Sequence, residues 1–243
     1  MPGRFIALEG PDGVGKTTLA QRLTDITYDT AVECLRLGHH DARPLVFVSR
    51  RQISGTSDYS ANVMRQLATV LWHSGDAPDL PDTFWVSVQA AWFTAHASTV
   101  LDPVLAAGYD VLVDGWVYKF FSKLLLQGHT QADLDVIFGR VRMPDAVLLL
   151  AADIGALYDR RQAPFRPAEL GMHAGYPQLG RDTFVEYQQR ALHHLRTFAV
   201  QPTWSTIRLD PASSVEQCAT LIAPLLVTLR HHHPTTHSQE ATE

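Results

Sequence analysis

Short apolar runs recur along the chain and predict the strands of one sheet. The first covers residues 5–9, and four more lie at residues 45–49, 110–114, 146–151 and 205–209. Unbroken apolar runs of this length are typical of strands that are buried on both faces. We therefore expect a five-stranded parallel sheet.

The stretches between these runs carry apolar residues at spacings of three and four, as helices with one buried face do. They cover residues 17–28, 58–73, 83–107, 131–140, 182–199 and 213–229. Strands that alternate with helices indicate a parallel sheet covered on both faces, a three-layer α/β/α fold. Ligands of such sheets bind at the carboxyl ends of strands, which here means the loops after Glu9, Ser49 and Asp114.

Two segments depart from this alternation. Residues 155–181 mix arginines and prolines with glycines, which predicts a mobile, arginine-rich lid. Residues 231–243 are polar and aperiodic, so we expect a disordered tail after one domain of residues 1–230. We do not expect metal binding by the histidines of that tail or by His39–Asp41, where adjacent side chains point apart.

Composition narrows the class of protein and its partners. The chain has 243 residues, of which 46% are hydrophobic, and this is enough for a large core. A net charge of -5 gives no general electrostatic reason to bind nucleic acid or a membrane. The two cysteines form no disulfide framework, and the chain shows neither a signal peptide nor a membrane-spanning apolar stretch, so we expect a cytoplasmic protein.

The first strand runs directly into a phosphate-binding loop within residues 5–18, FIALEGPDGVGKTT. The pattern G-x-x-x-x-G-K-[ST] is met at Gly10, Gly15, Lys16 and Thr17. Glycines let successive backbone N–H groups converge on phosphate oxygens, the lysine ammonium reaches the terminal phosphates, and the threonine hydroxyl binds Mg²⁺. The positive end of the following helix adds to the attraction.

This motif predicts the fold of P-loop NTPases, with ATP and Mg²⁺ as the cofactors. The residues expected to hold ATP are Gly10, Asp12, Gly13, Val14, Gly15, Lys16, Thr17 and Thr18.

The chain resembles the thymidylate kinase family of nucleoside monophosphate kinases. FIALEGPDGVGKTT is similar to that family's F-I-x-x-E-G-x-D-G-x-G-K-[ST]-T, and SRRQISGT at 49–56 is a weaker match to T-R-E-P-G-G-T. LDPVLAAGYDVLVDGW at 101–116 is similar to I-x-P-A-L-x-x-G-x-x-V-I-x-D-R-Y. The likeness returns at PDAVLLLAAD and in the lid, and it covers most of residues 4–209.

The resemblance implies roles for several residues that would bind the phosphate acceptor. It assigns Asp12 to the sugar 3′-hydroxyl and Arg50 to the acceptor phosphate, with Arg51 as a competitor because one residue is extra there. The family's phenylalanine and base-reading arginine align with Gln89 and Phe93, which could donate to a base and stack on it, respectively.

A second departure from the family lies after the third strand. The family has arginine directly after the strand-terminal aspartate, where this chain has Gly115. Either Lys119, five residues past Asp114, supplies the missing charge, or the site takes a different acceptor. Trp116 could shape the acceptor pocket, although aromatic residues at helix starts are more often part of the core.

Phosphoryl transfer needs placement of the acceptor oxygen and neutralisation of charge on the transferred group. We expect Lys16 to hold the donor phosphates and Thr17 to hold Mg²⁺. Asp114 would hold the magnesium shell or the acceptor, unless it instead caps a helix. The arginines expected to close over the transferred group are Arg160, Arg161 and Arg166, although an arginine run is otherwise a solvated face.

The leading hypothesis is an ATP-dependent kinase of a nucleoside monophosphate, either dTMP or a modified pyrimidine deoxynucleotide. An alternative keeps the P-loop and changes the acceptor to a phosphonate, a sugar or a specialised metabolite. A third is a nucleotide-binding regulator without turnover, which the lid argues against because a switch needs no cover over an acceptor. The resemblance suggests a homodimer through residues 83–107, although a helix buried in a monomer would look the same.

Overall fold

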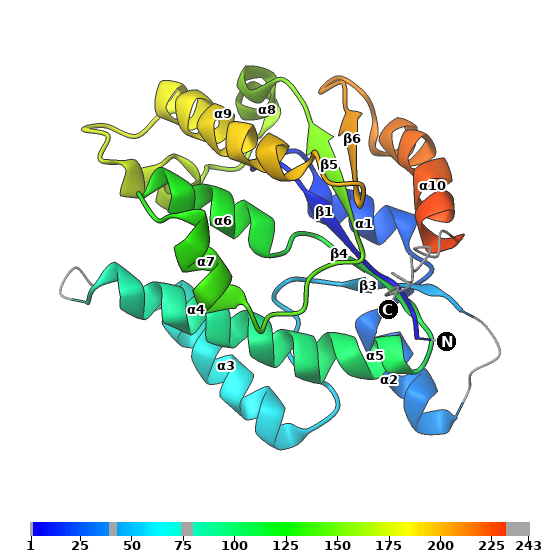
Figure 1. Cartoon of the computed structure of the whole chain (residues 1–243). Helices are drawn as coiled ribbons and strands as arrows, with labels where there is room; N and C mark the ends of the chain where they lie inside the picture. The colour runs from blue at the N-terminus through cyan, green and yellow to red at the C-terminus, as the bar shows by residue number, and fades with distance from the viewer. Residues whose placement is uncertain (1, 39–42, 74–79, 232–243) are drawn as a thin grey trace, which may run out of the picture.

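The computed structural model describes residues 2–38, 43–73 and 80–231, and it contains one parallel sheet (Figure 1). The strand order is β2-β3-β4-β1-β5-β6, and every pairing between neighbours is parallel. The strands are β1 (Phe5–Glu9), β2 (Ile26–Thr27), β3 (Leu45–Val48), β4 (Asp110–Val113), β5 (Ala146–Ala151) and β6 (Trp204–Arg208). His39–Asp41 and the predicted tail, apart from His231, lie outside the described residues.

The sheet has one strand more than the five that the apolar runs predict. The extra strand is β2, two residues long, which pairs Ile26 with Val46 and Thr27 with Phe47 at the edge of the sheet. Asp25 fixes this edge, since its backbone N–H donates to Leu45 O at 2.8 Å and its carboxylate accepts from Leu45 N at 2.7 Å. A two-residue edge strand leaves no apolar run to recognise.

Helices cover both faces of the sheet, as the alternation predicts. Figure 1 shows α1 and α10 on one side and α4, α6 and α9 on the other. The helices are α1 (Lys16–Leu23), α2 (Tyr28–Leu37), α3 (Asp58–His73), α4 (Asp82–His96), α5 (Asp102–Ala106), α6 (Val117–Leu126), α7 (Gln131–Phe138), α8 (Ile154–Arg160), α9 (Arg181–Phe198) and α10 (Val215–His231). A π-helical turn, Ala97–Leu101, joins α4 to α5, so the predicted helix 83–107 is one continuous but irregular element.

Helices α2, α6 and α8 are absent from the sequence-based prediction, and the helix predicted at residues 17–28 ends at Leu23. The hydroxyl of Thr27 caps α2 by accepting from Thr30 N, and Gly38 ends it with a φ of 71°. In α6, Lys119, Ser122 and Lys123 form a polar stripe at spacings of three and four. Lys119 and Ser122 are nevertheless buried, so this polar stripe lies against the rest of the protein and not in solvent.

The predicted lid is folded in this structure. It begins in α8 and continues through two short 3₁₀ turns, Pro167–Glu169 and Met172–Ala174, to the start of α9. The Phe165 ring stacks on Tyr158 at 5.0 Å and lies 4.3 Å from the Phe184 ring of α9. An aromatic cluster therefore holds the lid against α9.

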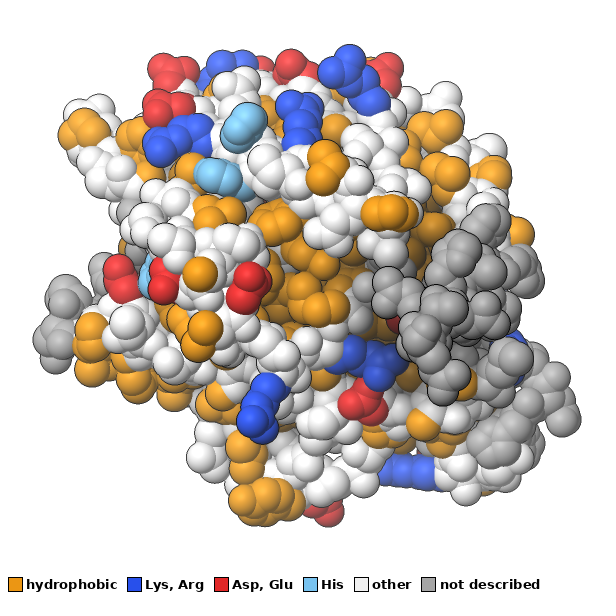
Figure 2. All heavy atoms as spheres, viewed as in Figure 1, with side chains coloured by type: hydrophobic (Ala, Val, Ile, Leu, Met, Phe, Trp, Pro, Cys, Tyr) orange, Lys and Arg blue, Asp and Glu red, His pale blue; other side chains and the backbone are white. Residues whose placement is uncertain are grey.

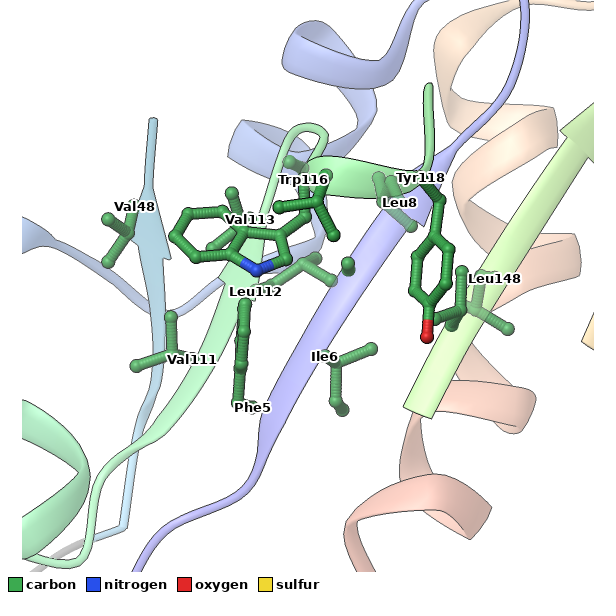
Figure 3. Close-up of a cluster of buried hydrophobic side chains, with 14 of the residues drawn as sticks. Phe5, Ile6, Leu8, Val48, Val111, Leu112, Val113, Trp116, Tyr118 and Leu148 are labelled. Atoms are coloured by element: carbon green, nitrogen blue, oxygen red, sulfur yellow. The ribbon is translucent and has the colours of Figure 1, made fainter. Parts of the chain in front are cut away.

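The core beneath the site is built on β1 (Figure 3). All five side chains of β1 are buried, and Phe5 meets Trp116 edge-on with ring centroids 5.2 Å apart. Trp116 also lies 4.8 Å from Phe93 of α4, and its indole N–H donates to Arg142 O at 2.8 Å. Burying one such side chain stabilises the fold by roughly 1.5–3 kcal/mol. This packing fixes the start of α6 against the sheet.

The surface seen in Figure 2 is apolar at its centre. Hydrophobic side chains gather there in a hollow between α9 and α5, with lysine, arginine, aspartate and glutamate side chains spread around it. None of the described helices is both long and apolar enough to cross a membrane.

Candidate active site

The loop between β1 and α1 has the backbone that a phosphate cradle requires. Gly10, Gly13 and Gly15 have φ angles of 146°, 82° and 96°, which side chains rarely tolerate. A Cβ atom at Gly10 would also lie 2.4 Å from the carbonyl oxygen of Leu150. Within the described residues, no side chain caps the N-terminus of α1, so its N–H groups face the loop and are available to an anion.

Lys16 bends back over this loop. Its ammonium donates to the carbonyl oxygens of Gly10 at 2.9 Å and Pro11 at 2.8 Å. Burial lowers the pKa of Lys16, while the carboxylates of Asp12 and Glu9 partly oppose this shift. The charge therefore sits where the loop would receive phosphate groups.

Asp114, which follows β4, connects α1 with the loop that follows β3. Its Oδ2 accepts from the Thr17 hydroxyl at 2.6 Å, and its Oδ1 accepts from Arg50 N at 2.8 Å. The N-cap of α6 is Trp116, so Asp114 does not cap that helix. A hydroxyl and a carboxylate side by side suit Mg²⁺, which takes few protein oxygens and completes its shell with phosphates and water. No cluster of three or more His, Cys, Asp or Glu side chains suited to a metal occurs among the described residues.

A pocket of about 590 Å³ opens beside the loop, between α4, α6 and the lid. Its volume is that of a small-molecule site. All six residues predicted to bind the acceptor line it: Asp12, Arg50, Gln89, Phe93, Trp116 and Lys119. These residues come from four separate segments of the chain, so the fold brings the predicted set together.

Three arginines converge on one part of this pocket. Arg50, Arg51 and Arg166 all line it, and the Arg51 guanidinium lies 4.6 Å over the ring of Trp72. Burial lowers the pKa of Arg51 to about 10, and the charges of Arg50 and Arg166 add to the effect. Clustered cations of this kind are stabilised when a phosphate dianion neutralises them.

Asp12 lies at the centre of a buried polar network on the pocket floor. Lys119 forms an ion pair with one carboxylate oxygen, while the other accepts from the Gln188 amide at 2.9 Å and lies 3.5 Å from Lys123 Nζ. Burial alone raises the pKa of Asp12, but the two ammonium groups hold it well below its usual range. Lys119 thus contacts Asp12, one helical turn past Gly115.

Glu9 is a buried carboxylate that the sequence analysis did not single out. Its Oε1 accepts from Trp116 N at 3.0 Å, and its Oε2 has no hydrogen-bond partner among the described residues. Burial raises its pKa to about 7, against smaller lowering effects of the Trp116 N–H and of Lys16 and Lys119. The sequence signal that could have revealed Glu9 is its position: it is an acidic residue at the end of an apolar strand, immediately before the phosphate loop. Glu9 links the loop strand to the start of α6.

The three lid arginines lie in different places. Arg160 donates to Gly13 O at 2.8 Å and to Pro211 O at 3.1 Å, so it contacts the phosphate loop. Arg161 lies 3.4 Å from a carboxylate oxygen of Glu169 and 4.2 Å over the Phe165 ring, inside the lid itself. Arg166 lines the acceptor pocket.

Two further pocket or network residues were missed. Lys123 follows Lys119 by one turn on α6, so the helical spacing could have revealed it once that helix was placed. Gln188 pairs with Asp12 across 176 residues, and nothing local in the sequence marks it.

A phosphate loop between β1 and α1, an aspartate at the end of β4 and a cationic pocket under a lid define a P-loop nucleotide kinase. No family model matches the chain. The curated relatives include thymidylate kinases from Dinoroseobacter shibae, 28% identical over 191 residues and 76% of each chain, and from Jannaschia sp., 29% identical over 202 residues, 75% of this chain and 85% of the relative. A third, from Ectopseudomonas mendocina, is 24% identical over 226 residues, 86% of this chain and 93% of the relative.

The solved structure of a thymidylate kinase from Candida albicans has a TM-score of 0.59 and 15% identity, covering 93% of this chain and 92% of that one. At that identity the likeness shows the fold alone. The sequence relatives show that the chain is similar to thymidylate kinases over 75–86% of its length.

Proposed function

We propose that the chain transfers the γ-phosphoryl group of ATP, with Mg²⁺, to a pyrimidine deoxynucleoside monophosphate such as dTMP. One observation carries the proposal. The six residues expected to bind the acceptor line a single pocket, and that pocket opens beside the phosphate loop. Acceptor and donor phosphates would then meet between Lys16 and the pocket arginines.

On the donor side, the loop N–H groups and the Lys16 ammonium would hold the phosphates of ATP. Mg²⁺ would be held by Thr17 and Asp114, where it would neutralise phosphate charge. Arg160, bonded to the loop at Gly13, is placed to approach the donor from the lid. Preorganised positive groups of this kind stabilise charge on the transferred group.

On the acceptor side, Arg50 and Arg166 would bind the phosphate, with Arg51 in the same cluster. Asp12 with Lys119 would lie by the sugar, and Phe93 and Trp116 would form an aromatic wall for the base. Folding the lid over this pocket would keep water from the donor phosphate.

A second candidate function is supported by a different observation. Gly115 has no side chain where the family has an arginine, and Lys119 forms an ion pair with Asp12 and is not free to replace it. This favours an acceptor with different charge placement, such as a phosphonate, a sugar or a specialised metabolite. Turnover with non-nucleotide acceptors alone would support that candidate over the first.

A coupled assay of ADP release, run across nucleoside monophosphates and non-nucleotide acceptors, tests both candidates. We expect the highest kcat/KM with dTMP or another pyrimidine deoxynucleotide. ATP binding without turnover of any acceptor would instead indicate a nucleotide-binding regulator.

We also propose a single kinase domain over residues 1–230 and a homodimer that uses α4. At the start of α4, Leu80 and Phe84 are exposed to 40% and 38%, whereas Val86, Trp92 and Phe93 are buried within the chain. Light scattering on the purified protein distinguishes a dimer from a monomer.

A further inference from the structure

His96 is a fully buried histidine to which the proposed function gives no role. It ends α4, where its ring centroid lies 5.3 Å from that of Trp116 and 6.0 Å from that of Trp92. Its Nε2 lies 3.0 Å from Ser49 O, and its Nδ1 has no hydrogen-bond partner among the described residues. A phenylalanine or leucine side chain would fill this place without burying an unpaired nitrogen, so the contact with Ser49 is what histidine adds.

This contact defines the protonation state of the ring. A carbonyl oxygen only accepts hydrogen bonds, so Nε2 carries the proton and donates to Ser49 O. Burial lowers the pKa of His96 to about 4, against smaller raising effects of the hydrogen bond to Ser49 and of the Asp114 carboxylate. The ring is therefore neutral near pH 7 and acts as a fixed hydrogen-bond donor.

The backbone that carries Arg50 is held at consecutive polar groups. Ser49 O accepts from His96, Arg50 N donates to Asp114 Oδ1 at 2.8 Å, and Arg50 O accepts from the Trp92 indole N–H at 3.1 Å. Trp92 and His96 lie one turn apart on α4, so one face of this helix supplies donors to two consecutive carbonyl groups. These hydrogen bonds leave the backbone of Arg50 little freedom.

The side chain of Arg50 lies beside the glycine that replaces the family's arginine. A Cβ atom at Gly115 would lie 3.7 Å from Arg50 Cδ and 3.9 Å from Lys16 Cε. Arg50 also lines the acceptor pocket. It is therefore next to both the phosphate loop and the pocket, where a small shift of its backbone would change its contact with a phosphate group.

We propose that His96 is a positioning residue that acts through Arg50: with Trp92 it holds the Ser49–Arg50 backbone so that the Arg50 guanidinium lies between the phosphate loop and the acceptor phosphate. This inference rests on the proposed nucleoside monophosphate kinase activity. It makes Gly115 compatible with that activity, because Arg50 supplies the positive charge that the family's arginine would have supplied there.

Two variants separate the hydrogen bond of His96 from its packing. His96→Phe keeps a ring and removes the donor. His96→Gln keeps a donor, because its amide nitrogen is the same number of bonds from the backbone as Nε2. Hydrogen exchange measured by mass spectrometry reports on the backbone N–H groups of Arg50 and of Gln52, which donates to Ser49 O at 2.8 Å. We expect exchange in this segment to be at least about fivefold faster in His96→Phe and close to the wild-type rate in His96→Gln.

The same proteins are titrated with dTMP by calorimetry in the absence of ATP, so no turnover is needed. In His96→Phe the Kd of dTMP should rise about tenfold, while the Kd of ATP changes less than about threefold. His96→Gln should bind dTMP within about threefold of the wild type. In an Arg50→Met background, His96→Phe should change the Kd of dTMP less than about twofold, because His96 acts only through Arg50.

Val100→Ala is the matched control for lost stability. Val100 lies one turn beyond His96 in the same continuous helical element, is fully buried, and does not line the acceptor pocket. Its truncation removes core packing, but it should leave both the exchange near Arg50 and the Kd of dTMP at wild-type values. His96→Leu, which also lacks a donor, takes the place of His96→Phe in every comparison if the larger ring prevents folding.

Unchanged exchange near Arg50 in His96→Phe would overturn the inference, and so would faster exchange that leaves the Kd of dTMP unchanged. Equal losses in His96→Phe and His96→Gln, or a full loss in the Arg50→Met background, would make His96 a packing residue only. A wild-type protein that does not bind dTMP, while its variants show the expected exchange, would instead contradict the proposed function and leave the positioning of Arg50 supported.

Discussion

Asp12 meets two ammonium groups and an amide at a buried position beside the acceptor pocket. Such a carboxylate balances buried charge, and its removal would leave Lys119 and Lys123 close together without compensation. The resemblance to thymidylate kinases adds contact with the acceptor sugar. A structural and a substrate-binding role are therefore expected to coincide in one residue.

We expect Asp12→Asn to lower the free energy of unfolding by about 3 kcal/mol and to raise KM for the acceptor more than KM for ATP. Urea unfolding and steady-state kinetics measure the two effects. The exposed Glu186, 3.7 Å from Arg190, gives the control Glu186→Gln, which should change neither quantity. Adding Lys119→Met to Asp12→Asn should recover part of the lost stability, and no recovery would show that the pair is not the cause.

Glu9 is expected to make the folded protein less stable as pH rises. Its pKa of about 7 in the folded protein lies above the ordinary value of 4.5, so the folded state binds the proton more tightly than the unfolded state does. The stabilising contribution of protonated Glu9 is therefore complete below pH 4.5 and is lost as pH rises through 7.

Glu9→Gln should remove this dependence. Relative to the wild type, the variant should gain up to about 3 kcal/mol in free energy of unfolding between pH 5 and pH 8. Urea unfolding at the two pH values measures the change. If the two proteins keep a constant difference across this range, then Glu9 is ionised to the same extent in both states.

At the scale of elements, the sequence predicts those strands and helices that depend on the local pattern of apolar and polar residues. The apolar runs locate β1, β3, β4, β5 and β6 because buried parallel strands need no polar face. It does not predict α6, whose two faces are both covered by the rest of the protein. The phosphate loop is also predictable from local sequence, because its glycines and Lys16 lie within one short segment. The contact between Gln188 and Asp12 is not, because it forms only when distant parts of the chain fold together.

The lid offers an element-scale prediction through Arg160. This side chain ties the end of α8 to the phosphate loop at Gly13 and to Pro211. Arg160→Ala should reduce kcat by about a hundredfold, because positive charge near the transferred group is lost. The control is Arg181→Ala, which breaks an exposed ion pair with Asp159 outside the pocket and should leave kcat unchanged. A kcat equal to that of the wild type in Arg160→Ala would make this arginine a structural link only.

At the scale of the whole molecule, the two ends of the described chain are joined at the amino-terminal ends of the central strands β1 and β4, opposite the site. The Asp110 carboxylate accepts from Arg4 N at 2.8 Å and from the Arg230 guanidinium at 2.7 Å. Arg4 in turn donates to Leu229 O at 2.6 Å. These hydrogen bonds hold the end of α10 against the start of β1 and β4.

Because this closure lies away from the pocket, it should contribute to stability and not to catalysis. Asp110→Asn should lower the free energy of unfolding by about 1–3 kcal/mol while kcat and KM stay at wild-type values. Thermal unfolding and kinetics on the same sample test this separation. A change in KM for the acceptor would show that the closure affects the geometry of the site.

The central claim is that phosphate passes from a donor on the Lys16 loop to a nucleotide in the adjoining pocket. The most direct measurement follows radiolabel from γ-labelled ATP into dTMP and dCMP, using wild-type protein and Lys16→Ala. We predict labelled nucleoside diphosphate with the wild type, and transfer at least about a hundredfold slower with Lys16→Ala, whose circular dichroism and unfolding transition remain those of a folded protein. Absence of label in either nucleotide with the wild type, or undiminished transfer with Lys16→Ala, would contradict the account.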